Sequence, residues 1–179
     1  MINVPEVDKA LSAKNNEESN RIQKPIAVKK ILVAIDKSGY KEKAVAYAIT
    51  LAKALGAEVT AVHVIDKSSL GITGELLGYY RGGKKGSYED AYENVLKKQA
   101  EKLLGEAELV GKKEGVKIDK EILMHSSSIP EEIIDYAKKN NVDLIVVGTM
   151  GMTGVAKFLL GSVASNVVAH AQCPVLAVR

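Results

Sequence analysis

Leu144-Ile145-Val146-Val147-Gly148-Thr149-Met150-Gly151, followed after nine residues by Gly161-Ser162, is the most informative part of this sequence. Its four leading apolar residues are typical of a strand that is buried on both faces. The glycines then follow the pattern G-x-x-G-(nine residues)-G-S, and a helix is predicted to begin near Ser162. A strand that opens through glycines onto a helix N-terminus brings backbone N–H groups close to a ligand and favours bound phosphate. The stretch therefore indicates an α/β fold and a nucleotide.

Similar apolar strands recur through the chain and alternate with helical patterns. Strands are predicted over 31–35, 58–65, 116–124, 143–148 and 174–178, and helices over 40–55, over 88–113, from Ser128 with Pro130 and Glu131 as start signals, and from Ser162 to before Pro174. The helix over 88–113 is expected to bury Tyr92, Val95, Leu96, Leu103, Ala107 and Val110. Strands that alternate with helices pair in parallel through right-handed crossovers. The expected fold is an open, doubly wound, five-stranded parallel sheet with helices on both faces, which is Rossmann-like.

Two segments fall outside this regular pattern. Residues 1–28 are polar and are expected to form a mobile leader, so that residues 29–179 form the folded domain. The glycine-rich segment Lys67–Ser87 carries Tyr79, Arg81 and Lys84, and its length indicates either a functional or a disordered loop.

Composition limits the class of protein. The 179 residues are 46% hydrophobic and 26% charged, with a net charge of +3 from interleaved acidic and basic residues, which argues against a nucleic-acid partner. The single cysteine, Cys173, excludes an internal disulfide framework and fits a reducing compartment. No apolar run approaches the roughly 20 residues that span a bilayer, and no secretory signal is apparent, so a cytoplasmic protein without a membrane contact is expected.

The chemistry is expected at the carboxyl ends of the strands, where ligands of open α/β sheets bind. Asp36 follows the first strand and the glycines follow the fourth, so a nucleoside fits between them if these strands are neighbours. Asp36 then accepts hydrogen bonds from the sugar, Gly148 and Gly151 admit the phosphates, and Gly161 and Ser162 donate N–H groups. Each residue alone also fits a plain structural role: Gly148 as a turn, and Ser162 or Asp36 as a helix cap. Their joint spacing favours the nucleotide.

Other signatures of nucleotide, metal or nucleophile chemistry are missing. The sequence has neither a G-x-x-x-x-G-K-[ST] loop nor G-x-G-x-x-G after the first strand. His63, His125 and His170 lack metal-ligand spacing, so no metal site built by the protein is expected, and His63 is interpreted as a packed polar residue that ends its strand. Lys157, between Gly151 and Gly161, fits equally a phosphate contact or a solvated side chain.

The chain from Lys29 to Arg179 resembles the universal stress protein family, whose ATP-binding signature is the G-x-x-G-(nine)-G-[ST] pattern. The segments Ile31–Ser38, His63–Asp66, Ser128–Ile134 and Leu160–Val178 also resemble that family. The resemblance implies an adenine nucleotide alpha hydrolase-like sheet, a homodimer, and ATP beside strands one and four. The nucleotide-binding residues that it implies are Ala34, Asp36, Val64 through its backbone, Gly148, Thr149, Met150, Gly151, Met152, Thr153, Gly154, Gly161, Ser162, Val163 and Ala164. Ala34 stands where ATP-binding members often have proline, and Ser128 stands where glycine is common.

Three functions remain open at this point. The favoured one is an ATP-binding regulatory protein of the stress response, a sensor or switch for an unknown protein partner, with Mg or Mn held through the phosphates. The alternative is a slow ATPase or nucleotidyl-transfer enzyme; no catalytic residue is assigned, because no charged cluster is placed to activate water. The third is a structural or chaperone-like dimer with an empty pocket. The dimer is expected to form through the short apolar last strand, Pro174–Val178.

Overall fold

The computed structural model describes residues 27–37, 41–66, 87–125, 128–149 and 160–179. The expected leader, except for Ala27 and Val28, lies outside these residues, as do Lys157 and nearly all of the expected loop Lys67–Ser87. The described part forms one five-stranded sheet in which every neighbouring pair is parallel, in the order β3-β2-β1-β4-β5. The strands are β1 (Lys30–Ala34), β2 (Glu58–Asp66), β3 (Ile118–His125), β4 (Leu144–Gly148) and β5 (Val175–Val178). The expected fold is confirmed.

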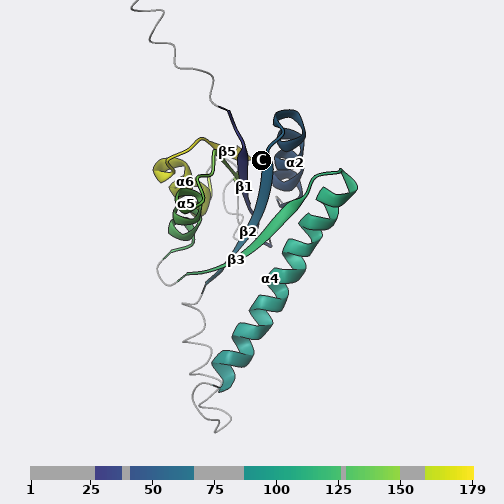
Figure 1. The fold of residues 1–179 in the computed structure, drawn as a ribbon. Coiled ribbons are helices and arrows are strands. Elements are labelled where there is room, and N and C mark those ends of the chain that lie inside the picture. Colours follow the sequence, from purple (N-terminus) through teal and green to yellow (C-terminus); the bar gives the residue numbers. More distant parts are fainter. Residues whose placement is uncertain (1–26, 38–40, 67–86, 126–127, 150–159) are drawn as a thin grey trace, which may run out of the picture.

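Helices cover both faces of the sheet (Figure 1). Their bounds are α2 (Lys41–Leu55), α4 (Ser87–Lys113), α5 (Ile129–Lys139) and α6 (Ser162–His170). Helices α2 and α4 share one hydrophobic core with the sheet, and α5 and α6 share the other. Alternate residues of β1 supply the two cores, with Ile31 and Val33 on the α2/α4 face and Leu32 on the α5/α6 face. This arrangement explains why the strand sequences are apolar throughout instead of alternating.

The start of α5 follows the expected capping pattern. The Ser128 hydroxyl oxygen accepts a hydrogen bond from the Glu131 N–H at 3.3 Å, and a proline stands in the first turn. Such a cap satisfies one of the backbone donors that a helix start leaves without an intrahelical partner. The cap therefore defines the start of α5, where the cavity-lining residue Ile129 lies.

The expected buried face of α4 is partly wrong. The residues buried against the sheet are Ala100, Leu103, Leu104, Ala107 and Gly111, whereas Val95 and Val110 are 47% and 44% exposed. The buried stripe is centred between Leu103 and Leu104, so that Val110 lies on its flank and Val95 lies further round the helix. Helix α4 also extends past the carboxyl ends of the strands (Figure 1), so that none of the described strands lies beneath its first turns. Tyr92 and Leu96 are half-buried.

Candidate functional site

A cavity of about 580 Å³ lies at the carboxyl ends of β1, β2 and β4. After β1 the chain adds β2 and β3 on one side, and it then returns to add β4 and β5 on the other. The strand order therefore reverses between β1 and β4, which is where open α/β sheets bind their ligands. The cavity is lined by Ala34, Ile35, Asp36, Lys37, Val62, His63, Val64, Ile65, Asp66, Leu96, Gln99, Ile129, Ile133, Val147, Gly148, Gly161, Ser162, Val163 and Ala164.

One compartment of the cavity is apolar. Its walls are Val62, Val64 and Val147 from the sheet and Ile129 and Ile133 from α5. These residues belong to, or pack against, the core between the sheet and α5/α6, and Ile133 is only 2% exposed. Branched side chains held by a packed core make a rigid slot, which suits a flat apolar group such as an aromatic base.

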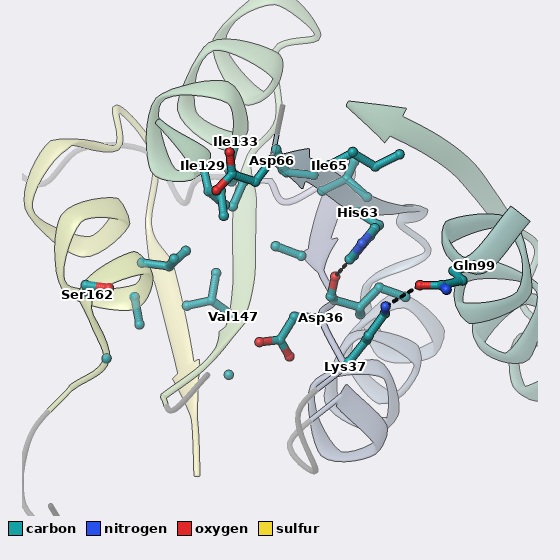
Figure 2. Close-up of a pocket in the computed structure, with 18 of the residues that line it drawn as sticks. Asp36, Lys37, His63, Ile65, Asp66, Gln99, Ile129, Ile133, Val147 and Ser162 are labelled. Carbon is teal, nitrogen blue, oxygen red and sulfur yellow. Dashed lines mark hydrogen bonds between the residues drawn. The ribbon is translucent and has the colours of Figure 1, made fainter. Parts of the chain in front are cut away.

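The polar side chains point in opposite directions from the end of β1 (Figure 2). The Asp36 carboxylate is directed to the side of α6, where Ser162 begins the helix. Lys37 extends the other way, and its ammonium group donates to the side-chain oxygen of Gln99 on α4 at 2.5 Å. At the end of β2, Asp66 lies beside Ile129 and Ile133. The carboxylates thus occupy the α5/α6 side of the cavity, and the Lys37 ammonium occupies the α4 side.

The N-terminus of α6 opens onto the cavity without a side-chain cap. Its N-cap residue is Gly161, and no side chain among the described residues caps the helix. The first intrahelical hydrogen bond is the one that the Ser165 N–H donates to the Gly161 C=O at 2.8 Å, so the N–H groups of Ser162, Val163 and Ala164 precede it. Such N–H groups, together with the positive end of the helix dipole, form a site for an anion.

Backbone hydrogen bonds hold the two ends of the glycine segment together at β4. The Gly161 N–H donates to the Thr149 C=O at 2.7 Å, and the Thr149 N–H donates to the Val178 C=O at 2.8 Å. Thr149 is buried, and its hydroxyl has no hydrogen-bond partner among the described residues. Thr149 therefore fixes the α6 N-terminus against the end of β4, although it does not line the cavity.

Strand β2 continues beyond the end of β1, and this changes what its backbone faces. Even-numbered residues of β2 direct their N–H and C=O groups to β1: Glu58 donates to the Lys29 C=O at 2.8 Å, and the Val62 C=O accepts from Ile35 at 2.9 Å. Val64 is the next residue of this set, and β1 has ended at its level. The Val64 N–H and C=O therefore face the cavity, as a donor and an acceptor side by side.

Most of the sequence-predicted site residues that the structure describes come together here. Ala34, Asp36, Val64, Gly148, Gly161, Ser162, Val163 and Ala164 all line the cavity, whereas Met150, Gly151, Met152, Thr153 and Gly154 lie outside the described residues. The cavity wall also contains residues that were not predicted from the sequence to belong to the site, among them Lys37, His63, Leu96, Gln99, Ile129 and Ile133. His63 was expected only to end its strand; it lies three residues before that end, and its ring is half-buried in the cavity wall.

The described part of the chain contains neither a metal-ligand cluster nor a membrane-spanning helix. No group of three or more His, Cys, Asp or Glu side chains there could hold a metal ion. Within the same residues, no helix combines the length and the apolar composition that a membrane crossing requires. Cys173 is a free thiol, half-buried beside the α5/α6 core, and burial raises its pKa.

Comparison with known proteins agrees with this architecture. Residues 27–179 match the universal stress protein family. The universal stress protein MJ0531 of Methanocaldococcus jannaschii is 39% identical over 153 residues, covering 84% of this chain and 82% of that protein. The solved structure of the hypothetical protein MJ0577 superposes with a TM-score of 0.70 at 27% identity, over 86% of this chain and 96% of that one. The universal stress protein from Archaeoglobus fulgidus, solved in complex with dAMP, superposes with a TM-score of 0.58 at 26% identity, over 86% and 100% of the two chains. This chain therefore belongs to the universal stress protein family.

Proposed function

We propose that this protein binds ATP in the cavity at the ends of β1 and β4 and acts as a nucleotide-dependent switch for a partner protein in the stress response. One observation carries the proposal: an apolar slot, a carboxylate and an uncapped helix N-terminus share one cavity at the point where the strand order reverses. These are the three chemistries that a base, a sugar and a phosphate chain require. The A. fulgidus relative, whose structure contains dAMP, supports an adenine nucleotide as the ligand.

The proposed pose assigns each part of ATP to one part of the cavity. The adenine lies between the branched side chains of the slot, with its Watson–Crick edge on the Val64 backbone. The ribose hydroxyls donate to Asp36, and the phosphates accept from the N–H groups that open α6. The segment Met150–Gly154 is proposed to complete the phosphate contacts. Mg or Mn is proposed to bind mainly through the phosphate oxygens.

The proposed role is binding rather than rapid hydrolysis. In the described part of the cavity wall, the ionisable side chains are Asp36, Lys37, His63 and Asp66, and Lys37 is engaged with Gln99 on the side away from α6. Fast phosphoryl transfer requires an oriented water and a cation at the transferring group. A helix N-terminus that grips the ground state and the transition state equally does not lower the barrier.

We further propose that the switch is a homodimer joined through β5. This strand is the edge of the sheet next to β4, and its residues Val175, Leu176 and Ala177 are only partly buried. An apolar edge strand offers a row of unpaired backbone groups, and a two-fold axis lets two copies satisfy each other. The stress signal would pass from the cavity to a partner protein through this assembly.

Titration calorimetry of nucleotide-free protein with Mg-ATP tests the proposal. We expect binding in the low micromolar range or tighter, and a ligand concentration of about 100 times Kd should add about 2.7 kcal/mol to the free energy of unfolding. Gly161→Val is the matched variant, because a side chain at the N-cap would fill the phosphate space while the rest of the domain is unchanged. Absence of binding by the folded wild type refutes the proposal.

The same samples separate a switch from an enzyme. We expect phosphate release well below about one turnover per minute for the protein alone. A release of several phosphates per second that disappears in Gly161→Val would instead establish the alternative, an ATPase on the same fold.

A further inference from the structure

The carbonyl of Ile35 has an unusual hydrogen-bond partner. The register pairs Ala34 with Val62, and the Ile35 N–H donates to the Val62 C=O at 2.9 Å, so the ladder between β1 and β2 runs one residue past the end of β1. The next bond of a regular parallel ladder would join the Val64 N–H to the Ile35 C=O. Among the described residues no such bond exists. The ladder therefore stops one bond early, at the wall of the cavity.

The Ile35 carbonyl oxygen accepts a hydrogen bond from a side chain instead. The Nδ1 atom of His63 lies 2.8 Å from the Ile35 carbonyl oxygen (Figure 2). Because a carbonyl oxygen only accepts hydrogen bonds, Nδ1 must carry the proton and donate. His63 thus makes the bond that the Val64 N–H would otherwise make.

The ring itself lies away from the proposed base. Side chains alternate along β2, with Val59 and Ala61 in the α2/α4 core and Val62 and Val64 in the α5/α6 core. By this alternation His63 belongs to the α2/α4 face, opposite to the apolar slot. Any effect of His63 on a base in that slot acts through the backbone of Val64 or through Asp36.

We infer that His63 is a positioning residue, which holds the Ile35 carbonyl so that the Val64 N–H stays available to a base and the peptide before Asp36 is fixed. The inference rests on the proposed function. The Ile35 carbonyl is part of the peptide bond between Ile35 and Asp36, so the same hydrogen bond also restricts the direction of the Asp36 carboxylate. One side chain thus preorganises the base contact and the sugar contact.

Amide hydrogen exchange on the free protein tests the structural half of this inference. Val62 lies inside the ladder and Val64 at its open end, so in the wild type the Val64 amide should exchange at least about tenfold faster than the Val62 amide. In His63→Leu, which keeps the bulk of the side chain and removes the donor, the ladder can close and Val64 exchange should slow. His63→Asn keeps a donor near the position of Nδ1 and should behave like the wild type.

Base discrimination tests the functional half. Adenine offers an acceptor at N1 and a donor at N6, which match the Val64 N–H and C=O, whereas hypoxanthine in ITP reverses both. We expect the wild type to prefer ATP to ITP by about tenfold, or about 1.4 kcal/mol. His63→Leu should lose most of that preference, and His63→Asn should retain it. A role confined to stability would shift the melting temperature and leave the ATP-to-ITP ratio unchanged.

The outcomes separate this inference from the proposed function. Equal protection of Val62 and Val64 in the wild type, or an unchanged ATP-to-ITP ratio in folded His63→Leu, overturns the role of His63 and leaves ATP binding standing. A wild type that binds no ATP refutes the proposed function and the functional half of this inference together. If His63→Leu does not fold, the inference is tested by the amide exchange rates of the wild type and by the ATP-to-ITP affinity ratio of His63→Asn. A His63→Asn protein that no longer prefers ATP to ITP counts against the inference.

Discussion

Two glycines in the same helix should respond in opposite ways to alanine. Gly111 is buried near the end of α4, and a Cβ there would lie 2.7 Å from the Val116 carbonyl oxygen and 2.7 Å from Ile118 Cγ1. The Val116 backbone cannot move aside easily, because its N–H donates to the Gly111 C=O at 2.8 Å. Gly105, which lies in the same helix closer to its N-terminus, has nothing within 4 Å of its Cβ position. The pair therefore separates helix propensity from packing.

The expected magnitudes follow from these distances. Alanine is favoured over glycine in a helix interior by about 1 kcal/mol, so Gly105→Ala should raise the free energy of unfolding by roughly 0.5–1 kcal/mol. At Gly111 the same gain is opposed by an overpacking cost of about 1–3 kcal/mol or more, since one of the clashing atoms belongs to the backbone. Gly111→Ala should therefore lower the free energy of unfolding, by roughly 1–2 kcal/mol.

Urea denaturation of the full chain, followed by circular dichroism, measures both variants against the wild type. A Gly111→Ala protein as stable as the wild type, or a destabilised Gly105→Ala protein, would refute the close approach of Gly111 to Val116 and to Ile118 of β3. The test bears on the site as well, because α4 carries Leu96 and Gln99 to the cavity wall.

Three further predictions concern the site, the edge of the sheet and the thiol of Cys173. Asp36→Ala should weaken ATP binding by about 1–3 kcal/mol in calorimetry through loss of charge-assisted hydrogen bonds to the ribose, and an unchanged affinity would exclude that contact. Ala177→Pro should make the protein monomeric in light scattering without unfolding it. The carbonyls of Pro174 and Val178 face β4, so the Ala177 N–H points to the open edge and its loss breaks no hydrogen bond to β4. A wild type that is already monomeric would contradict the proposed dimer. Because burial raises the pKa of Cys173, its thiolate fraction at about pH 8 should be lower than in the unfolded chain, and iodoacetamide should alkylate the folded protein more slowly; equal rates would contradict the burial.

The sequence predicts most of the fold, because the information lies in local pattern. Apolar runs such as Ile31–Ile35 mark strands buried on both faces, and Ser128 with Pro130 marks the start of α5. The exposed positions of Val95 and Val110 could not be predicted in the same way. Periodicity shows that a helix has an apolar face, but the part of α4 that meets the sheet depends on where the helix crosses it.

In the candidate site, too, residues marked by local pattern could be predicted, whereas residues brought together by packing could not. Asp36 and Gly148 were placed from the predicted strand ends and Gly161 from the predicted start of the last helix, and all three line the cavity. Lys37 and Gln99 are 62 residues apart, and only the packing of α4 brings them together. The role of His63 could not be predicted, because it depends on where β1 ends relative to β2. The last residue of β1, Ala34, pairs with Val62, so His63 lies just beyond the paired part of β2. That register is set by the packing of the two strands and not by local pattern.

Amide chemical shifts during a titration of nucleotide-free protein with Mg-ATP show whether an adenine nucleotide occupies this cavity. We expect saturable shifts at two places that are far apart in sequence, the Val64 amide and the amides of Ser162, Val163 and Ala164 at the start of α6. AMP should shift the Val64 amide but move the α6 amides less. Absence of saturable shifts, or shifts confined to residues outside the cavity wall, would contradict nucleotide binding in this cavity.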